Sequence, residues 1–483
     1  MKRNATLIGI AYCQTGLVAA LTWGIWSRRL PLGVKGEWEW PTVGSPSAVL
    51  DVVLAVLVVF GYAALVFGLT RWLRPFTSKR RAAAALCVLF VAGTAAQAVT
   101  PIGAPYAYGP AKTALVVFYP SSNGYYTLGA TIDDPWAFLA AYPEWIKRQD
   151  AMHIGTHPPG LFLFERALLG CFRYSPAAAQ FVVQLAPGPV FEGVKVIRQD
   201  NPLPLAESAV LLATAAAALV CCVATILPLY ALVRATHGPA SAWYAAAIWP
   251  LVPATILFQP VSDIAFPLLS TTALACVAWS SRRDSLGLAF ATGLMLAGGM
   301  QFTLAFLPVG VIVAAMFALE RTLAPRRRLI LIVAVGGGFF AFTLGWWALT
   351  SANPFAIWWA NQANHARFYR EQPKSYWAWV VENPLELAVA CGLPAFLWML
   401  VGLRDGPRVA WVTLAMLVFL TVGGRNLSEV ARLWILFYPA LVAAAGAGLE
   451  RLDAGPRSLA YTVAAQGLQL VALETLIQVS LSF

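Results

Sequence analysis

Long runs of apolar residues alternate with short charged connections along almost the whole chain. Most runs approach or exceed the roughly 20 residues that an α-helix needs to cross a bilayer. Helices are expected because a lipid-exposed strand or loop would leave backbone groups without hydrogen bonds. The runs lie at 5–25, 48–70, 83–101, 205–233, 241–259, 262–280, 285–302, 304–320, 328–350, 385–403, 408–423, 430–449 and 458–481. They predict an all-α polytopic transmembrane bundle, with residues 1–483 forming a single integral membrane domain.

One region leaves the number of crossings open. The run at 158–172 and a weaker run at 177–191 either form a hairpin that enters the membrane or do not cross it. The two alternatives predict about 15 or about 13 spanning helices by the same length criterion.

Composition supports a membrane protein and excludes a soluble one. Of the 483 residues, 59% are hydrophobic and only 11% are charged, whereas soluble domains carry about 25% charged residues. The net charge of +11 fits basic cytoplasmic loops, so we expect no nucleic-acid partner. The seven cysteines have no metal-ligand spacing and are expected to pack as small apolar residues.

Basic residues predict the orientation of the bundle. Clusters in short connections are expected on the cytoplasmic side; they are Lys2/Arg3, 71–81, Arg282/Arg283, 321–328, Arg404/Arg408 and Arg451/Arg457. The outer face then receives the loops 26–47, 102–157, 351–384 and 424–429. A multi-pass cell-membrane protein is therefore predicted, with any site of chemistry on the non-cytoplasmic face.

Two of the outer loops are long and rich in aromatic residues, and long ordered loops often carry function. Residues 134–146 of the 102–157 loop read as an amphipathic helix lying on the membrane, with Trp136 at headgroup depth. The 351–384 loop contains four tryptophans and is expected to do the same.

Asp133 and Asp134 form an acidic pair in the first long outer loop. A carboxylate beside a membrane-lying helix can be partly desolvated, which raises its pKa toward a value suited to a general base. Alternatively, Asp134-Pro135 caps and starts that helix, because Asp suits the N-cap and Pro the first turn. A cap explains only one of the two acids.

Two histidines bracket the next motif, His153-Ile-Gly-Thr-His157-Pro-Pro-Gly160. Pro158 suits the first turn of the following helix, so His157 is expected at a helix N-terminus, which attracts anions. The alternative is a helix-start signal with an interfacial histidine. A metal site is only weakly indicated, since no carboxylate stands at metal-ligand spacing from His153 and His157.

A third group of polar residues opens a late helix. Arg425, Glu429 and Arg432 are spaced by four and three residues and so share a helix face. Arginine in a membrane segment suggests function, and its planar fork matches phosphate; the alternative is a self-satisfied pair between Glu429 and Arg432. Asp263, near a predicted helix break, is a supporting candidate.

These features together resemble the GT-C superfamily of membrane glycosyltransferases, which use polyprenyl-phosphate-linked sugars. The resemblance lies in Asp133-Asp134 in the first large outer loop, His157-Pro-Pro-Gly160 at a helix start, the proline-containing 243–263 run, and Glu429-x-x-Arg432-x-Trp434. In architecture it covers most of the chain.

The resemblance implies an inverting transfer of a sugar to an acceptor hydroxyl on the outer face. Asp133 or Asp134 would be the base, and Arg432, Arg425 and His157 would hold the donor phosphate. His153, Glu429 and Asp263 would support them, and the sugar or lipid would contact Tyr125, Tyr126 and Trp136. Some relatives use a divalent cation, and no spacing here decides that point. The acceptor could be a lipid, a glycan or a protein.

Two other functions stay open at this point. A transporter or flippase of a lipid-linked or small hydrophilic substrate would carry ionisable groups near the midplane and paired broken helices. The clearest charges here lie toward the outer face, and no second half mirrors the first. An enzyme that joins an oligosaccharide to a lipid would share the same outer site.

Overall fold

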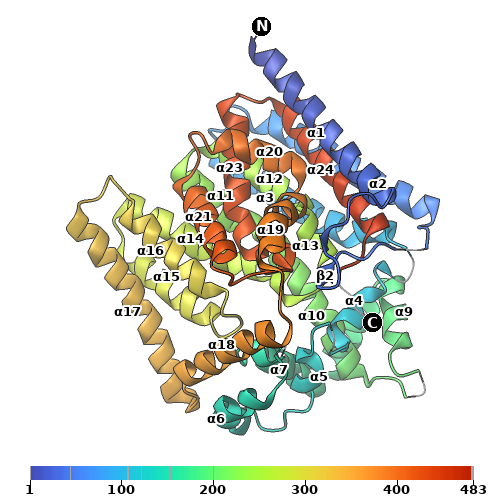
Figure 1. Cartoon of the computed structure of the whole chain (residues 1–483), viewed down its shortest axis with the longest axis vertical. Coiled ribbons are helices and arrows are strands. Elements are labelled where there is room, and N and C mark those ends of the chain that lie inside the picture. Colours follow the sequence, from blue (N-terminus) through green and yellow to red (C-terminus); the bar gives the residue numbers. More distant parts are fainter. Residues whose placement is uncertain are drawn as a thin grey trace.

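The computed structural model describes residues 2–43, 45–105, 108–120, 122–151, 154–199 and 201–479. Most of these residues lie in helices. The only named strands among them are β1 (Gly33–Val34) and β2 (Trp38–Glu39), which pair antiparallel. Figure 1 shows the helices gathered in one bundle, so the predicted all-α fold class is confirmed.

Seven helical segments of the described chain are long and apolar enough to cross a membrane. An eighth arises if the bent pair α19 (Tyr376–Cys391) and α20 (Leu393–Gly402), which meet at 103°, counts as one span. The predicted membrane protein is thus supported. The seven segments are built from α1 (Lys2–Trp26), α2 (Val49–Leu73), α3 (Lys79–Val99), α10 (Leu205–Ala224) with α11 (Ile226–Thr236), α12 (Pro239–Ile248) with α13 (Pro253–Leu257), α14 (Phe266–Arg283) and α17 (Pro325–Thr350).

The predicted total of 13 to 15 spanning helices is not confirmed, because several apolar runs fold into shorter pieces. Three form helices of 14, 13 and 15 residues; at about 1.5 Å per residue each is shorter than a hydrocarbon core of about 30 Å. The 430–449 run is also broken, since Pro439 suits the first turn of a new helix. These pieces are α15 (Leu286–Gly299), α16 (Phe306–Ala318), α21 (Arg408–Val422), α22 (Val430–Leu433) and α23 (Tyr438–Arg451).

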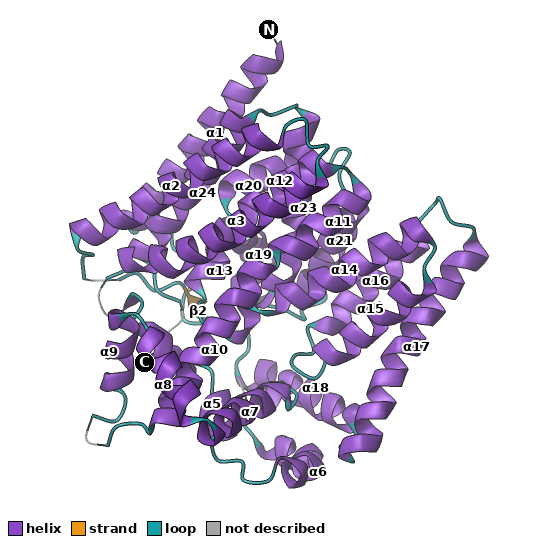
Figure 2. Ribbon diagram, turned by 180° about the vertical axis from the view of Figure 1, so that it is seen from behind, coloured by secondary structure: helices purple, strands orange, loops and turns teal. Residues whose placement is uncertain are grey.

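The ambiguous region between 158 and 204 forms three short helices, α7 (Gly160–Tyr174), α8 (Pro176–Leu185) and α9 (Gly188–Val196). None is a candidate span. With α4 (Lys112–Phe118) and the start of α10 they surround a second, smaller apolar core, at the lower end of the molecule in Figure 2.

Predicted cytoplasmic connections meet at one end of the bundle. Arg408, after α20, lies 2.9 Å from Glu320, which precedes α17. Arg451, at the end of α23, lies 2.9 Å from Asp405, and the Asp405 carbonyl also contacts Nε2 of His237 at 3.2 Å. Four connections distant in sequence are therefore tied together on the side predicted to be basic.

The two long outer loops lie at the opposite end, as Figure 1 shows for α5 (Tyr125–Gly129), α6 (Pro135–Trp145) and α18 (Pro354–Glu371). Two amides of α18 hold them together. Nδ2 of Asn361 donates to the carbonyls of Gly155 and His157, at 2.9 and 3.0 Å. Nδ2 of Asn364 donates to those of Ile146 and Gly155, both at 2.9 Å. The first long loop is thus fixed against the second.

The first short outer loop joins the same end. Glu37 accepts hydrogen bonds from the indole N–H of Trp379 at 2.7 Å and from the Ser375 N–H. Thr42 forms an isolated antiparallel bridge with Ile477, which follows α24 (Pro456–Leu476). The 26–47 loop is therefore tied to the start of α19 and to the residue after α24.

Candidate functional site

A cavity of about 460 Å³ lies at this end of the molecule, between the loop helices and the bundle. Its lining includes charged and polar side chains together with leucine, proline and phenylalanine. Its wall draws on α5, the turn before α7, the turn before α14, α16, α18, the end of α21 (Arg408–Val422) and α22. The titratable residues that line it are Tyr125, His157, Asp263, His365, Tyr369, Arg425, Glu429 and Arg432.

The start of α22 places the carboxylate of Glu429 and the guanidinium of Arg432 on the cavity wall. Ser428 and Glu429 both have left-handed backbone conformations, with φ of 98° and 54°, so the chain turns sharply before the helix begins. The carboxylate of Glu429 then lies 2.6 Å from a terminal nitrogen of Arg432. Burial opposes the charge, but Glu429 and Asp263 raise the pKa of the Arg432 guanidinium. Arg432 is a fixed cation.

Arg432 still has hydrogen-bonding capacity. Its Nε atom is buried and has no hydrogen-bond partner among the described residues. A buried donor without a partner is costly, so this atom is suited to receive an oxygen of a ligand.

Asp263 reaches the same cavity from the break between α13 and α14. It lies in a short 3₁₀ turn, Ser262–Ile264, directly before α14. The residue is half-buried, and its carboxylate acts electrostatically on both Arg432 and Tyr125. The cavity therefore joins a carboxylate and a guanidinium that are far apart in sequence.

Tyr125 and His157 form the side contributed by the first long loop. The two rings meet edge to face with centroids 5.2 Å apart, and Phe162 packs on Tyr125 at 5.3 Å. Burial raises the pKa of Tyr125 well above its ordinary value, so its phenol stays neutral and can donate. The His157 carbonyl accepts from the hydroxyl of Tyr142 at 2.6 Å, which fixes the turn.

Three cavity residues of α18 escaped the sequence analysis. Asn361, His365 and Tyr369 recur every four residues and share one face of the helix. The hydroxyl of Tyr369 accepts from the Leu427 N–H at 3.1 Å and lies 3.3 Å from the Arg425 carbonyl. The sequence does show these three polar residues at helical spacing. The four tryptophans of the loop nevertheless led to the prediction of a helix lying on the membrane rather than one facing a site.

Asp133 and Asp134 do not line this cavity. Asp134 is the N-cap of α6 and accepts from the N–H groups of Trp136 at 2.8 Å and Ala137 at 3.2 Å. Asp133 is exposed, and its carbonyl accepts from Arg166 at 3.3 Å. The structure thus gives Asp134 the capping role that the sequence offered as the alternative.

Of the three residues predicted to contact the sugar or lipid, only Tyr125 lines the cavity. Tyr126, next to the cavity residue Tyr125, turns instead into the second core, with its hydroxyl 3.4 Å from Glu207. Trp136 is 62% exposed on α6. His153 lies outside the described residues, so the structure does not place it.

Neither a metal site in the described part of the chain nor membership of a known protein family is supported. Over the described part of the chain, no group of three or more His, Cys, Asp or Glu side chains is arranged to hold a metal ion. No protein-family model matches the sequence, and a search of curated proteins finds no match.

Proposed function

We propose that this chain is a membrane glycosyltransferase of the GT-C type, which moves a sugar from a polyprenyl phosphate to an acceptor hydroxyl. The observation that carries the proposal is the cavity itself, because one chamber holds Asp263 as a base and Arg432 as a cation with an unused donor. Such groups suit a reaction that generates an alcohol nucleophile and a phosphate leaving group.

The apolar residues that line the cavity support a lipid-linked donor. Leu307, at the start of α16, lines the cavity and is also 43% exposed on the outside of the bundle. On the neighbouring α21, Leu420 lines the cavity and Phe419 is 65% exposed. A polyprenyl chain lying in the membrane can therefore reach the polar chamber from the side, while its phosphate meets the arginines.

The proposed reaction is a single displacement. Asp263 takes the proton from the acceptor hydroxyl, whose oxygen attacks the anomeric carbon. The bond from that carbon to the phosphate oxygen breaks, and its electrons leave with the polyprenyl phosphate, so the configuration inverts. Arg432 and Arg425 stabilise the departing phosphate, and Tyr125 can donate to an oxygen of either substrate.

In this account the cavity opens on the non-cytoplasmic side of a cell membrane. Exposed tryptophans on α6 and α18, Trp136 and Trp359, support helices that lie along the headgroups. We further propose that the short helices α15, α16 and α21, together with α23 and α24, also cross. They would bring the eight candidate spans to thirteen.

The test uses purified protein in nanodiscs with a panel of radiolabelled polyprenyl-phosphate sugars and lipid, glycan and peptide acceptors. Transfer by the wild type, lost in Asp263→Asn and in Arg432→Gln, is the expected result. The opposite result is consumption of no donor, together with movement of a lipid-linked sugar across proteoliposomes that survives Asp263→Asn. That outcome would replace the transferase with a flippase.

A further inference from the structure

We propose that one face of α18, carrying Asn361 and His365, selects the transferred sugar by accepting hydrogen bonds from its hydroxyl groups. This inference rests on the proposed function and adds the specificity-determining residues to it. The two residues are four apart on the helix and both line the cavity, so they present one surface to a ligand.

The side-chain amide of Asn361 uses its donor atom but not its acceptor atom. Its Nδ2 atom donates to two backbone carbonyls, those of Gly155 and His157, which fixes the orientation of the amide. Its Oδ1 atom is buried and has no hydrogen-bond partner among the described residues. An amide oxygen is an acceptor only, so the complementary ligand group must be a donor, as a sugar hydroxyl is.

His365 extends the same surface one turn further along α18. Burial, and then the nearby Arg425 cation, lower the pKa of His365 below its ordinary value. The imidazole is therefore neutral at pH 7, and one of its two ring nitrogens is an acceptor of hydrogen bonds. Its ring is braced edge to face by Tyr369, with centroids 5.2 Å apart.

The two walls of the cavity are complementary to different parts of one molecule. The wall at α22 offers the unused donor of Arg432 to an anionic oxygen. The wall at α18 offers acceptors, and an anionic group there would meet the amide oxygen unfavourably. This division fits a neutral hexose or pentose with free hydroxyls at α18 and its phosphate at Arg432.

The chain supplies a matched control for Asn361. Asn364 is also a buried amide of α18, and its Nδ2 holds the same Gly155 carbonyl as well as that of Ile146. Asn364 does not line the cavity. Asn364→Ala therefore loosens the contact between the loops as Asn361→Ala does, without removing a cavity acceptor.

The experiment measures binding in nanodiscs, with two short-chain probes. One is citronellyl phosphate and the other is the same phosphate carrying a mannosyl or an arabinofuranosyl group. The wild type is expected to prefer one of the two sugars, and to bind the probe that carries this sugar more tightly than the bare phosphate. Asn361→Ala should weaken the binding of that probe roughly fivefold, as expected for one lost hydrogen bond. It should leave the binding of the bare phosphate unchanged. Asn364→Ala should leave the preference intact.

Monodeoxy versions of the sugar-bearing probe then identify the hydroxyl. Removal of the recognised hydroxyl should weaken binding to the wild type and have no effect on Asn361→Ala. His365→Gln, which keeps an acceptor, should retain more of the sugar preference than His365→Phe. The inference is overturned if Asn361→Ala keeps the full preference or if Asn364→Ala loses it equally. Failure of the proposed function looks different, because the wild type would then transfer no sugar from any polyprenyl-phosphate donor, whichever probes the wild type and the variants bind.

Discussion

A terminal guanidinium nitrogen of Arg432 lies 2.6 Å from the carboxylate of Glu429, three residues earlier, on the wall of the outer cavity. The pair does not exhaust the arginine, because its Nε has no partner in the described chain. Glu429 thus orients the guanidinium and leaves one edge for a ligand. This is why the pair is compatible with a phosphate site, although the sequence also allowed a self-satisfied ion pair as the alternative.

Arg432→Gln should lower transfer by about 10²- to 10³-fold, the usual effect of removing one group that stabilises transition-state charge. Arg432→Lys should rescue little, since a lysine cannot make the same fork of donors. The measurement is the initial transfer rate in nanodiscs. Arg370→Gln, which removes an exposed arginine of α18 away from the cavity, is the control. An equal loss in that variant would mean that only overall charge matters.

Asp263→Asn should abolish the base while keeping the size of the side chain. Asp133→Asn should retain most transfer, because its side chain is exposed outside the cavity. Asp134→Ala should lower the free energy of unfolding by about 1 kcal/mol through loss of the α6 cap. The rates and thermal midpoints of the three variants provide the comparison. Activity that depends on Asp133 and survives Asp263→Asn would restore the acidic pair as the catalytic group.

Glu165 should make the protein less stable as the pH rises. Burial raises the pKa of this carboxyl from 4.5 to about 8 in the folded chain, where it also accepts from Thr214 at 2.8 Å. The folded state therefore holds a proton that the unfolded chain releases, so stability is greatest below pH 4.5 and falls up to about pH 8.

Glu165→Gln should remove that part of the pH dependence and raise the thermal midpoint at pH 8, on the order of a few degrees. Thermal unfolding in detergent between pH 5 and pH 9 provides the measurement. Identical slopes for the wild type and the variant would show that Glu165 is ionised in the fold.

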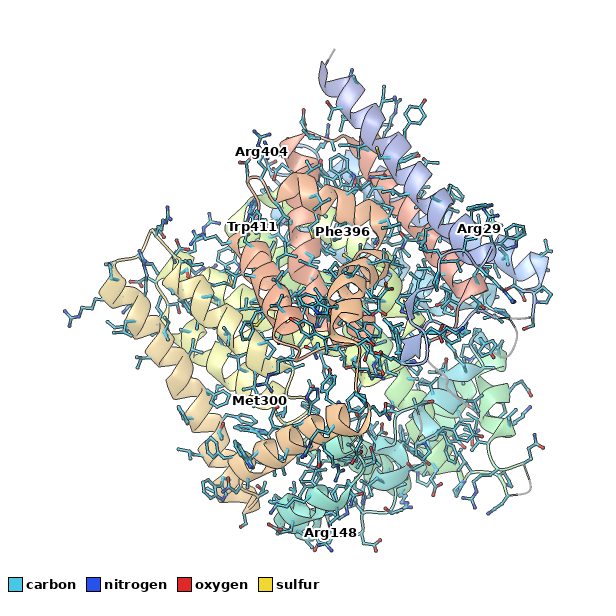
Figure 3. All side chains as sticks on the ribbon, viewed as in Figure 1. Arg29, Arg148, Met300, Phe396, Arg404 and Trp411 are labelled. Carbon is cyan, nitrogen blue, oxygen red and sulfur yellow. The ribbon has the colours of Figure 1, made fainter. Side chains whose placement is uncertain are left out.

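The proposed sidedness can be tested with two introduced cysteines. Figure 3 shows Arg148 and Arg404 at opposite ends of the molecule, the first below α18 and the second beside the basic connections. In whole cells, Arg148→Cys should react with a membrane-impermeant maleimide, and Arg404→Cys should react only after permeabilisation. The unsubstituted chain, with its seven native cysteines, gives the background. Labelling of both sites in intact cells would contradict the orientation.

Hydropathy was sufficient to predict the fold class because a bilayer constrains backbone hydrogen bonding so strongly. It could not give the number of crossings, since three apolar helices have only 13 to 15 residues. The criterion of about 20 residues for a membrane-spanning helix does not decide whether they cross. The break at Pro439 and the bend between α19 and α20 are set by local backbone geometry and by packing, which no hydropathy window contains.

The candidate site was predicted only in part. Arg425, Glu429, Arg432, His157, Tyr125 and Asp263 were each singled out from the sequence, and the structure brings them to one cavity. Asp133 and Asp134 were expected to supply the base because they lie beside a predicted membrane-lying helix and because the resemblance gives that role to an acid of the first large outer loop. Whether a carboxylate faces a chamber or caps a helix depends on where the chain turns, and that is a tertiary property. Asn361 and His365 were missed because the tryptophans of their loop indicated an interfacial helix, although the two residues have helical spacing.

The most direct test of the central claim is to locate the lipid phosphate on the protein. A citronellyl phosphate probe with a diazirine next to the phosphate would be photolysed in nanodiscs and its adducts mapped by mass spectrometry. The account predicts adducts within 361–369 and 425–437, suppressed by excess citronellyl phosphate and by Arg432→Gln. Competed adducts confined to residues 133–145, or to the opposite end around 404–409, would contradict the claim that this cavity is the active site.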